Sequence, residues 1–181
     1  SVKLPVIMYH SLLKDEKLQN DYTVSPTLFE NDLKYLAENG YTTVVVKDLT
    51  DYVYGKKSLS EKCIMLTFDD GYEDNYTELF PILQESGAVA TVFLIQNCVG
   101  QKNYLSEEQI LQMQASGLVR FGCHTADHVD LAGQSAQEMK EQMQSCKRYL
   151  EALLGEPCRS VAYPYGSYNE NVCRAAGELF S

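Results

Sequence analysis

Apolar runs alternate with amphipathic stretches along nearly the whole chain. Runs rich in apolar and β-branched residues predict strands, and they occupy residues 3–9, 41–46, 63–68, 88–95, 118–123 and 159–163. Between them, apolar residues recur at helical spacing, which predicts helices within 25–40, 75–86, 106–117, 135–155 and 169–180, and a shorter helix or turn over 48–54. Strands that alternate with helices predict an α/β fold with a parallel sheet, open or closed into a barrel.

Capping residues mark the ends of the predicted helices. Ser25 stands directly before Pro26, an arrangement typical of a helix N-terminus. Three further pairs have the spacing of a capping box or of a variant of it: Ser106 with Gln109, Ser135 with Glu138, and Asn75 with Glu78. Glycines follow most of these helices, as expected for C-terminal caps, at positions 40, 87, 117 and 155.

Polar residues follow several predicted strands at the point where each strand ends. His10, the acidic pair at 69–70, His124 and residues 163–166 each come directly after or at the end of such a run. In parallel α/β folds, the carboxyl ends of the strands carry the functional groups. His128 lies four residues after His124, so all three histidines of the chain are predicted to lie on this face.

The acidic pair Asp69 and Asp70 allows two interpretations. The two carboxylates could simply cap the helix that follows, where negative charge is favourable. They could instead bind a cation, because a charge buried at a strand end without a partner is costly. His124 and His128 would place both rings on one side of a helical turn, although such a pair alone is a weak signal. Combined, the two histidines and one acid would form an open metal site and leave the second acid as a general base.

The bulk properties of the chain exclude some classes of function. A length of 181 residues predicts one domain, and a net charge of −10 argues against nucleic acid or an anionic membrane surface as a partner. No stretch is apolar enough to span a bilayer, and no signal peptide precedes Ser1, so a leader or anchor is expected to have been removed. The six cysteines include no CxxC pair and predict no disulfide framework; Cys63 and Cys123 are expected to be buried.

Three motifs then carry a resemblance to a known family. Residues 67–71 (TFDDG), 124–128 (HTADH) and 163–166 (YPYG) resemble, in order, the first three motifs of the polysaccharide deacetylases. These are carbohydrate esterase family 4, the NodB-homology domain, and the similarity covers essentially the whole chain. The resemblance implies a distorted (β/α) barrel over residues 1–181 and a metal-dependent N-deacetylase activity. Only six strands are predicted, which leaves open whether the barrel is incomplete or the chain is cut short.

The resemblance also implies a role for each motif residue. Asp69 would be the general base, while Asp70, His124 and His128 would bind a divalent metal, with Zn²⁺ expected and Co²⁺ or Ni²⁺ as alternatives. The backbone N–H of Tyr165 would help to hold the oxyanion, with Tyr163 and Pro164 beside it at the substrate. Taken alone, residues 163–166 would rather be interpreted as an ordinary proline turn.

The chain departs from the family pattern at two positions that normally carry catalytic residues. The arginine usually found two residues before the proline of the third motif is replaced by Ala162, and Arg159 is out of register. The usual C-terminal Leu-x-His, which supplies the general acid, is also absent. Residues 5–11 (PVIMYHS), however, resemble the N-terminal motif of the poly-N-acetylglucosamine deacetylases, whose histidine acts as the acid. By this resemblance, His10 would be the general acid. The alternative is that His10 is an ordinary histidine at a strand end whose ring is hydrogen bonded to the backbone.

The expected reaction is removal of N-acetyl groups from a polysaccharide that contains N-acetylglucosamine, outside the cell or at the cell envelope. Two alternatives remain open at this point. One is an O-acetyl xylan esterase that uses the same residues. The other is a non-catalytic carbohydrate-binding relative, which the missing arginine and the short C-terminus would favour. The presence of the base, the three ligands and His10 argues against a non-catalytic role.

Overall fold

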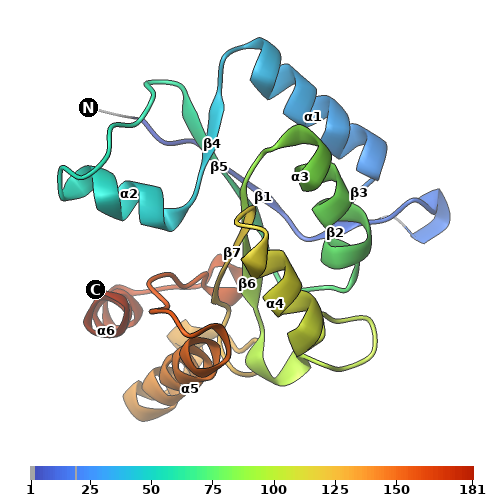
Figure 1. The fold of residues 1–181 in the computed structure, drawn as a ribbon. Coiled ribbons are helices and arrows are strands. Elements are labelled where there is room, and N and C mark those ends of the chain that lie inside the picture. The colour runs from blue at the N-terminus through green and yellow to red at the C-terminus, as the bar shows by residue number, and fades with distance from the viewer. Residues whose placement is uncertain (1–2, 19) are drawn as a thin grey trace.

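A computed structural model describes residues 3–18 and 20–181 of the chain. Within these residues the main sheet has five parallel strands, which are β1 (Val6–Tyr9), β4 (Thr42–Val44), β5 (Cys63–Phe68), β6 (Ala90–Leu94) and β7 (Val119–Cys123). The order is β1-β5-β6-β7, and β4 pairs with β5 beside this path (Figure 1). The predicted α/β fold with a parallel sheet is therefore confirmed, and the described strands form an open sheet.

Strand β5 is the centre of this sheet. Its residue Met65 pairs with Val6 of β1 and with Val44 of β4, so these two strands lie on opposite edges of β5. Thr67, further along, pairs with Met8 of β1 and with Thr91 of β6. Strands β4 and β6 therefore share one edge of β5, the first at its start and the second at its end. This arrangement places the carboxyl end of β5 between the ends of β1 and β6.

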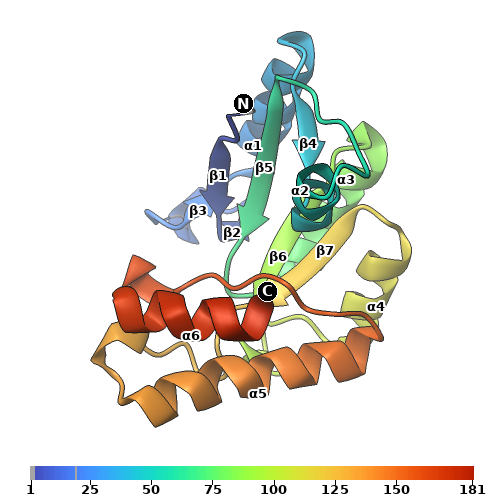
Figure 2. The same ribbon diagram turned by 90° about the vertical axis from the view of Figure 1, so that its left-hand side faces the viewer.

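Helices cover the sheet as an α/β fold requires. They are α1 (Pro26–Glu38), α2 (Val46–Val53), α3 (Phe80–Ser86), α4 (Glu107–Ala115), α5 (Ala136–Leu154) and α6 (Glu170–Phe180). A π-helical segment, Asn75–Leu79, leads into α3. Figure 2 shows α5 and α6 packed next to each other near the carboxyl ends of β5 and β7. Among the described residues, no helix combines the length and the apolar character that crossing a membrane requires.

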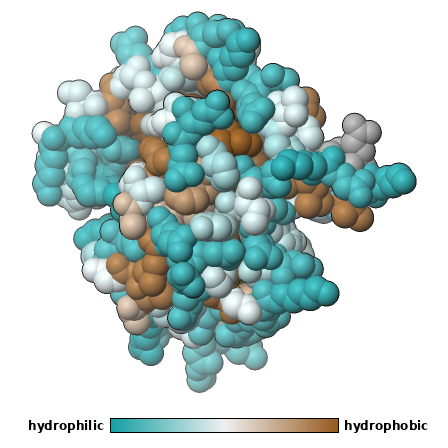
Figure 3. Space-filling model, turned by 45° about the vertical axis from the view of Figure 1, so that its right-hand side comes forward, coloured by the Kyte–Doolittle hydropathy of each residue, from teal (hydrophilic) through white to brown (hydrophobic). Residues whose placement is uncertain are grey.

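Small elements complete the fold. Strands β2 (Ser11–Leu12) and β3 (Thr23–Val24) form a separate parallel pair, which the sequence did not predict. Short 3₁₀ turns occur at Glu16–Leu18, Gln96–Cys98, Leu131–Gly133 and Pro164–Gly166. The surface seen in Figure 3 is largely hydrophilic, with apolar atoms gathered in small patches, as suits a charged chain.

The core lies between the sheet and the helices. All residues of β5 and β6 are buried, which explains why these two runs are apolar throughout. Tyr9 stacks on Phe68 at 5.0 Å between ring centroids, and Phe29 of α1 meets both rings edge-on. A second buried cluster joins α5 to α6 through Leu131, Met139, Met143, Val172 and Ala176.

Most of the predicted helix ends are confirmed. Ser106 with Gln109 and Ser135 with Glu138 form complete capping boxes, and Ser25 accepts a hydrogen bond from the Leu28 N–H. The prediction for Asn75 was wrong, because its side chain bonds to another segment and not to its own helix. All six cysteines are free thiols, and Cys63 and Cys123 are buried as expected.

The predicted strand at 159–163 was also wrong. This segment makes a single bridge, between Val161 and Cys123 of β7, and no strand. Pro157 and Pro164 flank it closely, and proline has no N–H to donate to a ladder, which keeps the extended stretch short. The bridge nevertheless sets residues 161–162 beside the end of β7.

Candidate metal centre

The acidic pair lies where β5 ends. The Asp69 N–H donates to the Tyr9 carbonyl at 2.9 Å, which continues the β1–β5 ladder by one residue. Asp70 and Gly71 then both adopt left-handed backbone conformations, with φ of 78° and 75°. Aspartate tolerates this region better than most residues. Only the Asp70 carboxylate belongs to a cluster with His124 and His128, so the two neighbouring acids are chemically distinct.

His124 is held rigidly at the end of β7. Its side chain is 2% exposed, and its backbone N–H donates to the Leu94 carbonyl at 2.9 Å. Its Nδ1 lies 2.9 Å from the carbonyl oxygen of Ala162, which can only accept a hydrogen bond. Nδ1 therefore carries the proton, which leaves Nε2 of the neutral ring with a free lone pair. That is the state in which histidine binds a metal.

His128 reaches the same place through an irregular turn. The expected helical turn from His124 to His128 was wrong, because Thr125 and His128 have φ of 68° and 57°. The His128 N–H instead donates to the buried Thr125 hydroxyl at 3.0 Å, and this bond closes the turn. The two imidazole rings end 4.9 Å apart, in an edge-to-face arrangement. The spacing of four thus brings the rings together without a helix.

Asp70, His124 and His128 converge on one point. The Oδ1 atom of Asp70 lies 3.4 Å from Nε2 of His124 and 3.4 Å from Nε2 of His128, and the three ligand atoms lie within 4.8 Å of one another. This Oδ1 is buried and has no hydrogen-bond partner among the described residues. An orphaned carboxylate oxygen facing two imidazole nitrogens is a donor set suited to a divalent cation such as Zn²⁺. The residues present therefore fit a metal.

Asp69 lies beside this triad in a different environment. It is 6% exposed, and burial raises the pKa of its carboxyl above the ordinary value. The nearby His124 and His10 oppose that shift in pKa, and the Asp70 carboxylate adds to it. A carboxylate with these neighbours is a stronger proton acceptor than an exposed one.

His10 lies at the junction of β1 and β2. Its ring packs edge-to-face against Tyr22 at 5.2 Å between ring centroids, and its carbonyl accepts a hydrogen bond from the Asn75 side chain at 3.1 Å. It faces a cleft of about 1210 Å³ that also contains both acids and the other two histidines. The structure thus brings together every residue for which the sequence predicted a catalytic or metal-binding role.

The third motif borders the same cleft. Tyr165 has φ of 61° within the turn Pro164–Gly166, and its ring meets His128 at 4.7 Å between centroids. Tyr163 lies 6.0 Å from Tyr168, again between ring centroids, while Pro164 is buried beneath the turn. Tyr163, Tyr165 and Tyr168 all line the cleft, so its rim on this side is aromatic.

Sequence reasoning missed two groups of site residues. Tyr72 stacks on Tyr104 at 5.2 Å between ring centroids, and burial together with the nearby Asp70 carboxylate raises the pKa of its hydroxyl. Asp74 and Asn75 bond to the segment that follows β1. Tyr72 follows directly on the acidic motif and could have been noticed there. No local signal identifies the other two, because their partners lie more than 60 residues away.

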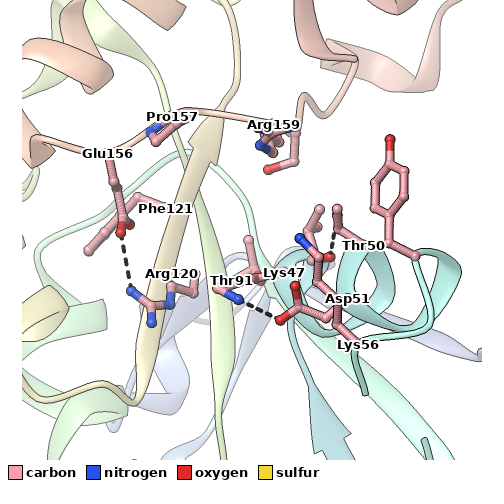
Figure 4. A pocket seen from close by; sticks show the side chains of 13 residues that line it. Lys47, Thr50, Asp51, Lys56, Thr91, Arg120, Phe121, Glu156, Pro157 and Arg159 are labelled. Atoms are coloured by element: carbon pink, nitrogen blue, oxygen red, sulfur yellow. Dashed lines mark hydrogen bonds and ion pairs between the residues drawn. The ribbon is translucent and has the colours of Figure 1, made fainter. Parts of the chain in front are cut away.

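A second, smaller cavity lies apart from the triad. Its volume is about 310 Å³, and it lies between α2, the first residues of β6 and β7, and residues 156–160 (Figure 4). Arg120 pairs there with Glu156 at 3.5 Å, and Lys47 pairs with Asp51. Arg159, the arginine that is out of register with the third motif, lines this cavity and not the cleft.

Comparisons with known proteins agree with this geometry. A family model described as polysaccharide deacetylase matches residues 56–179. YxkH of Bacillus subtilis, inferred to be a polysaccharide deacetylase, is 37% identical over 96% of this chain. The poly-beta-1,6-N-acetyl-D-glucosamine N-deacetylase of Staphylococcus aureus is 26% identical over 83% of it. The solved structure of the Streptococcus pyogenes deacetylase PplD, in complex with acetate, superposes with a TM-score of 0.90 and 29% identity.

The matched proteins are longer than the region they share with this chain. The chain covers 61% of YxkH and 56% of the Staphylococcus aureus enzyme. It covers 81% of the PplD structure, and that structure accounts for 99% of this chain. The similarity therefore extends over the whole described fold.

Proposed function

The chain belongs to the polysaccharide deacetylase family, and on this premise we propose that it hydrolyses N-acetyl groups on a polysaccharide containing N-acetylglucosamine. Residues 1–181 would act as one deacetylase domain, outside the cell or at the cell envelope, where such polymers occur. The named activity of the Staphylococcus aureus relative supports this choice of substrate.

The position of Asp70 Oδ1 carries the proposal. This buried oxygen, without a partner among the described residues, lies 3.4 Å from both histidine Nε2 atoms. We propose that Asp70, His124 and His128 hold a divalent metal, with Zn²⁺ first and Co²⁺ or Ni²⁺ as alternatives. Two nitrogens and one oxygen leave coordination positions open, as catalytic sites require. When bound, such a cation polarises the acetyl carbonyl and eases the ionisation of water.

Asp69 has the position and the environment of the general base. It is adjacent to Asp70 in the chain, yet the left-handed turn at Asp70 leaves its carboxylate outside the triad. Its buried carboxylate would take a proton from the water that attacks the acetyl carbon. Ala162 stands where the family usually carries an arginine, and the neighbours whose charges act on the pKa of Asp69 are His124, His10 and Asp70.

His10 would complete the reaction as the general acid. When the C–N bond of the tetrahedral species breaks, the nitrogen needs a proton, because an amine is a good leaving group and an unprotonated amide anion is a poor one. His10 follows β1 and Asp69 follows the neighbouring strand β5, so the two residues face the same cleft from adjacent strand ends. The products are acetate and a free amine on the sugar, and the water proton taken by Asp69 balances the proton given by His10.

The third motif would hold the acetyl group and the sugar. The left-handed conformation of Tyr165 places a backbone turn next to His128, and the N–H of Tyr165 would stabilise the oxyanion. The rings of Tyr163 and Tyr165, supported by the buried Pro164, present apolar faces to the cleft. Such faces suit the C–H surfaces of a pyranose ring.

One comparison of substrates tests this function against its alternatives. Acetate release is measured from N-acetylglucosamine oligomers and from O-acetylated xylan, with protein to which Zn²⁺ has been added. Release from the oligomers supports the proposal, whereas release from xylan alone would favour an esterase. Binding of either glycan without any release would identify a non-catalytic relative. A double variant of His124 and His128 serves as the control for spontaneous hydrolysis.

A further inference from the structure

Two residues beyond the acidic motif bond to the backbone of the His10 segment. The Asn75 side-chain amide donates to the His10 carbonyl at 3.1 Å and to Asp74 Oδ1 at 3.0 Å. The Asp74 carboxylate also accepts the Leu12 N–H at 3.1 Å and the Ser11 hydroxyl. These bonds tie three consecutive residues, 10–12, to two consecutive residues, 74–75. We refer to Ser11, Asp74 and Asn75 as the His10 clamp.

The chemistry of the partners fixes the orientation of Asn75. A backbone carbonyl and a carboxylate can only accept hydrogen bonds, so the NH₂ end of the amide must face both of them. Asn75 is 0% exposed, and its Oδ1 has no hydrogen-bond partner in the described part of the chain. The residue thus leaves one polar atom buried and unpaired while it bonds to His10. Such an arrangement is unfavourable for folding alone, and it calls for another explanation.

The backbone at Asn75 is unusual as well. Asn75–Leu79 is π-helical, and the Phe80 N–H donates to the Asn75 carbonyl five residues back. Pro81, which has no N–H, lies in the first turn of the following helix α3. Short π-helical segments are rare and occur often at functional sites. Here the segment begins at the residue whose side chain reaches His10.

From these observations we infer that Asp74 and Asn75 are positioning residues, which hold His10 in place relative to the base Asp69. The inference rests on the acid role proposed for His10. Residues 69–75 would then bear the base, one metal ligand and the support for the acid. Because Asp69 also bonds to the Tyr9 carbonyl at 2.9 Å, both sides of His10 are tied to the same stretch of chain. The distance between acid and base would then be set by this stretch together with the pairing of β1 and β5.

The test replaces Asn75 with Ala and follows His10 directly. Ring-labelled histidine gives separate NMR signals for the three histidines in the Zn²⁺-loaded protein. Asn75→Ala should shift or broaden the His10 signal, leave those of His124 and His128 in place, and leave the bound zinc unchanged. Turnover should fall by about 10–10²-fold with KM little changed, which is the usual effect of a small misplacement of a reacting group.

A control variant separates the clamp from general contact between the two segments. Lys14 and Glu78 form an ion pair at 2.9 Å that joins the same two segments at the surface, away from His10. Glu78→Gln removes this ion pair and should leave both turnover and the His10 signal as in the unmodified protein. Ser11→Ala removes one bond of the clamp with little change in volume, and it replaces Asn75→Ala if that variant does not fold.

A double-variant cycle decides between positioning and mere stabilisation. In a His10→Ala background, Asn75→Ala should cause little further loss of turnover, because the group that it positions is already absent. An equal loss in both backgrounds, or an unmoved His10 signal in Asn75→Ala, would overturn the inference. If His10→Ala alone left turnover unchanged, the acid role would be wrong, and with it the catalytic purpose of the clamp. The NMR shift would still show whether the clamp holds His10.

Discussion

Asp70 Oδ1 and His124 Nε2 lie 3.4 Å apart, and His128 Nε2 lies at the same distance on its own side of the oxygen. The separation is longer than a normal hydrogen bond, yet all three atoms face one another. In the neutral ring of His124, Nδ1 donates to the Ala162 carbonyl, and Nε2 is then an acceptor nitrogen that faces an acceptor oxygen. A cation between them removes this mismatch.

The first prediction concerns metal retention. His124→Ala and His128→Ala should each lose tightly bound zinc, because two remaining ligands do not hold the ion as three do. The measurement is metal content after dialysis, with circular dichroism to verify the fold. His10→Ala is the matched control, since it removes a histidine from the same cleft and should keep the metal. Retention of zinc by both ligand variants would place the metal elsewhere.

The second prediction separates the two adjacent acids. Asp69→Asn should keep the metal and lose most turnover, by about 10²–10⁴-fold, because an amide does not accept the proton of water. Asp70→Asn should weaken zinc binding, and excess zinc should restore part of its activity. Zinc titration and acetate release are measured on both variants. Equal loss of metal in both, without rescue by zinc, contradicts the division of roles.

In the unmodified protein, the raised pKa of Asp69 has a further consequence for pH dependence. Its cause is chiefly burial, which favours the neutral form. In the metal-free protein, Asp69 should therefore take up its proton at a higher pH than an exposed aspartate. A divalent cation held by Asp70, His124 and His128 favours the ionised form, so zinc should move the protonation of Asp69 to lower pH. The base must be ionised, and activity should be lost as pH falls through the pKa of Asp69 in the zinc-loaded protein.

The third prediction concerns Gly71, which follows the acidic pair. Its φ is 75°, and a Cβ there would come within 2.5 Å of Leu94 Cδ2. Gly71→Ala should therefore lower the free energy of unfolding by roughly 2–5 kcal/mol, the sum of a left-handed alanine and a tight contact in the core. Denaturant unfolding gives the value.

Gly117 provides the control for this change. Its φ is 76°, and nothing lies within 4 Å of a Cβ placed there. Gly117→Ala should cost only the backbone part, about 1–2 kcal/mol. Equal costs at both positions would show that the Leu94 side chain moves away from the added methyl group without a cost in stability.

The sequence pattern correctly predicted those helix ends and strands that are determined by residues close together in the chain. The two residues of the capping box, Ser135 and Glu138, are three positions apart, and both halves of the box form as expected. Strand β5 matches its prediction at both ends, because all of its residues are buried and the polar turn follows at once. The acidic pair and the two histidines could be grouped in advance, since parallel strands bring their carboxyl ends together.

One long-range contact and two local ones explain where the predictions from the sequence pattern failed. Asn75 has the spacing of a helix cap, but its amide is used by His10, 65 residues earlier in the chain. His128 follows His124 at helical spacing, but the buried Thr125 hydroxyl closes a tighter turn between them. Segment 159–163 has the composition of a strand, and its flanking prolines limit it to one bridge. In each case the conformation depends on a hydrogen bond or a flanking proline that the spacing of polar and apolar residues does not reveal.

The last prediction concerns His10 itself and completes the assignment of the three histidines. An acid must be protonated while the base is ionised, so turnover should follow a bell-shaped pH profile. Asp69 would set the acid limb and His10 the alkaline limb. His10→Ala should remove the alkaline limb and lower turnover by about 10²–10⁴-fold, the usual contribution of a positioned acid.

Tyr22→Phe serves as the control, because the Tyr22 ring packs against His10 at 5.2 Å and loses only its hydroxyl. It should leave the profile bell-shaped. A substrate with a better leaving group would sharpen the result, since an amine that departs without help needs no acid. His10→Ala should therefore lose much less on an activated acetanilide than on the sugar amide. An equal loss on both substrates would mean that His10 binds the substrate, and the proton would then have to come from another group.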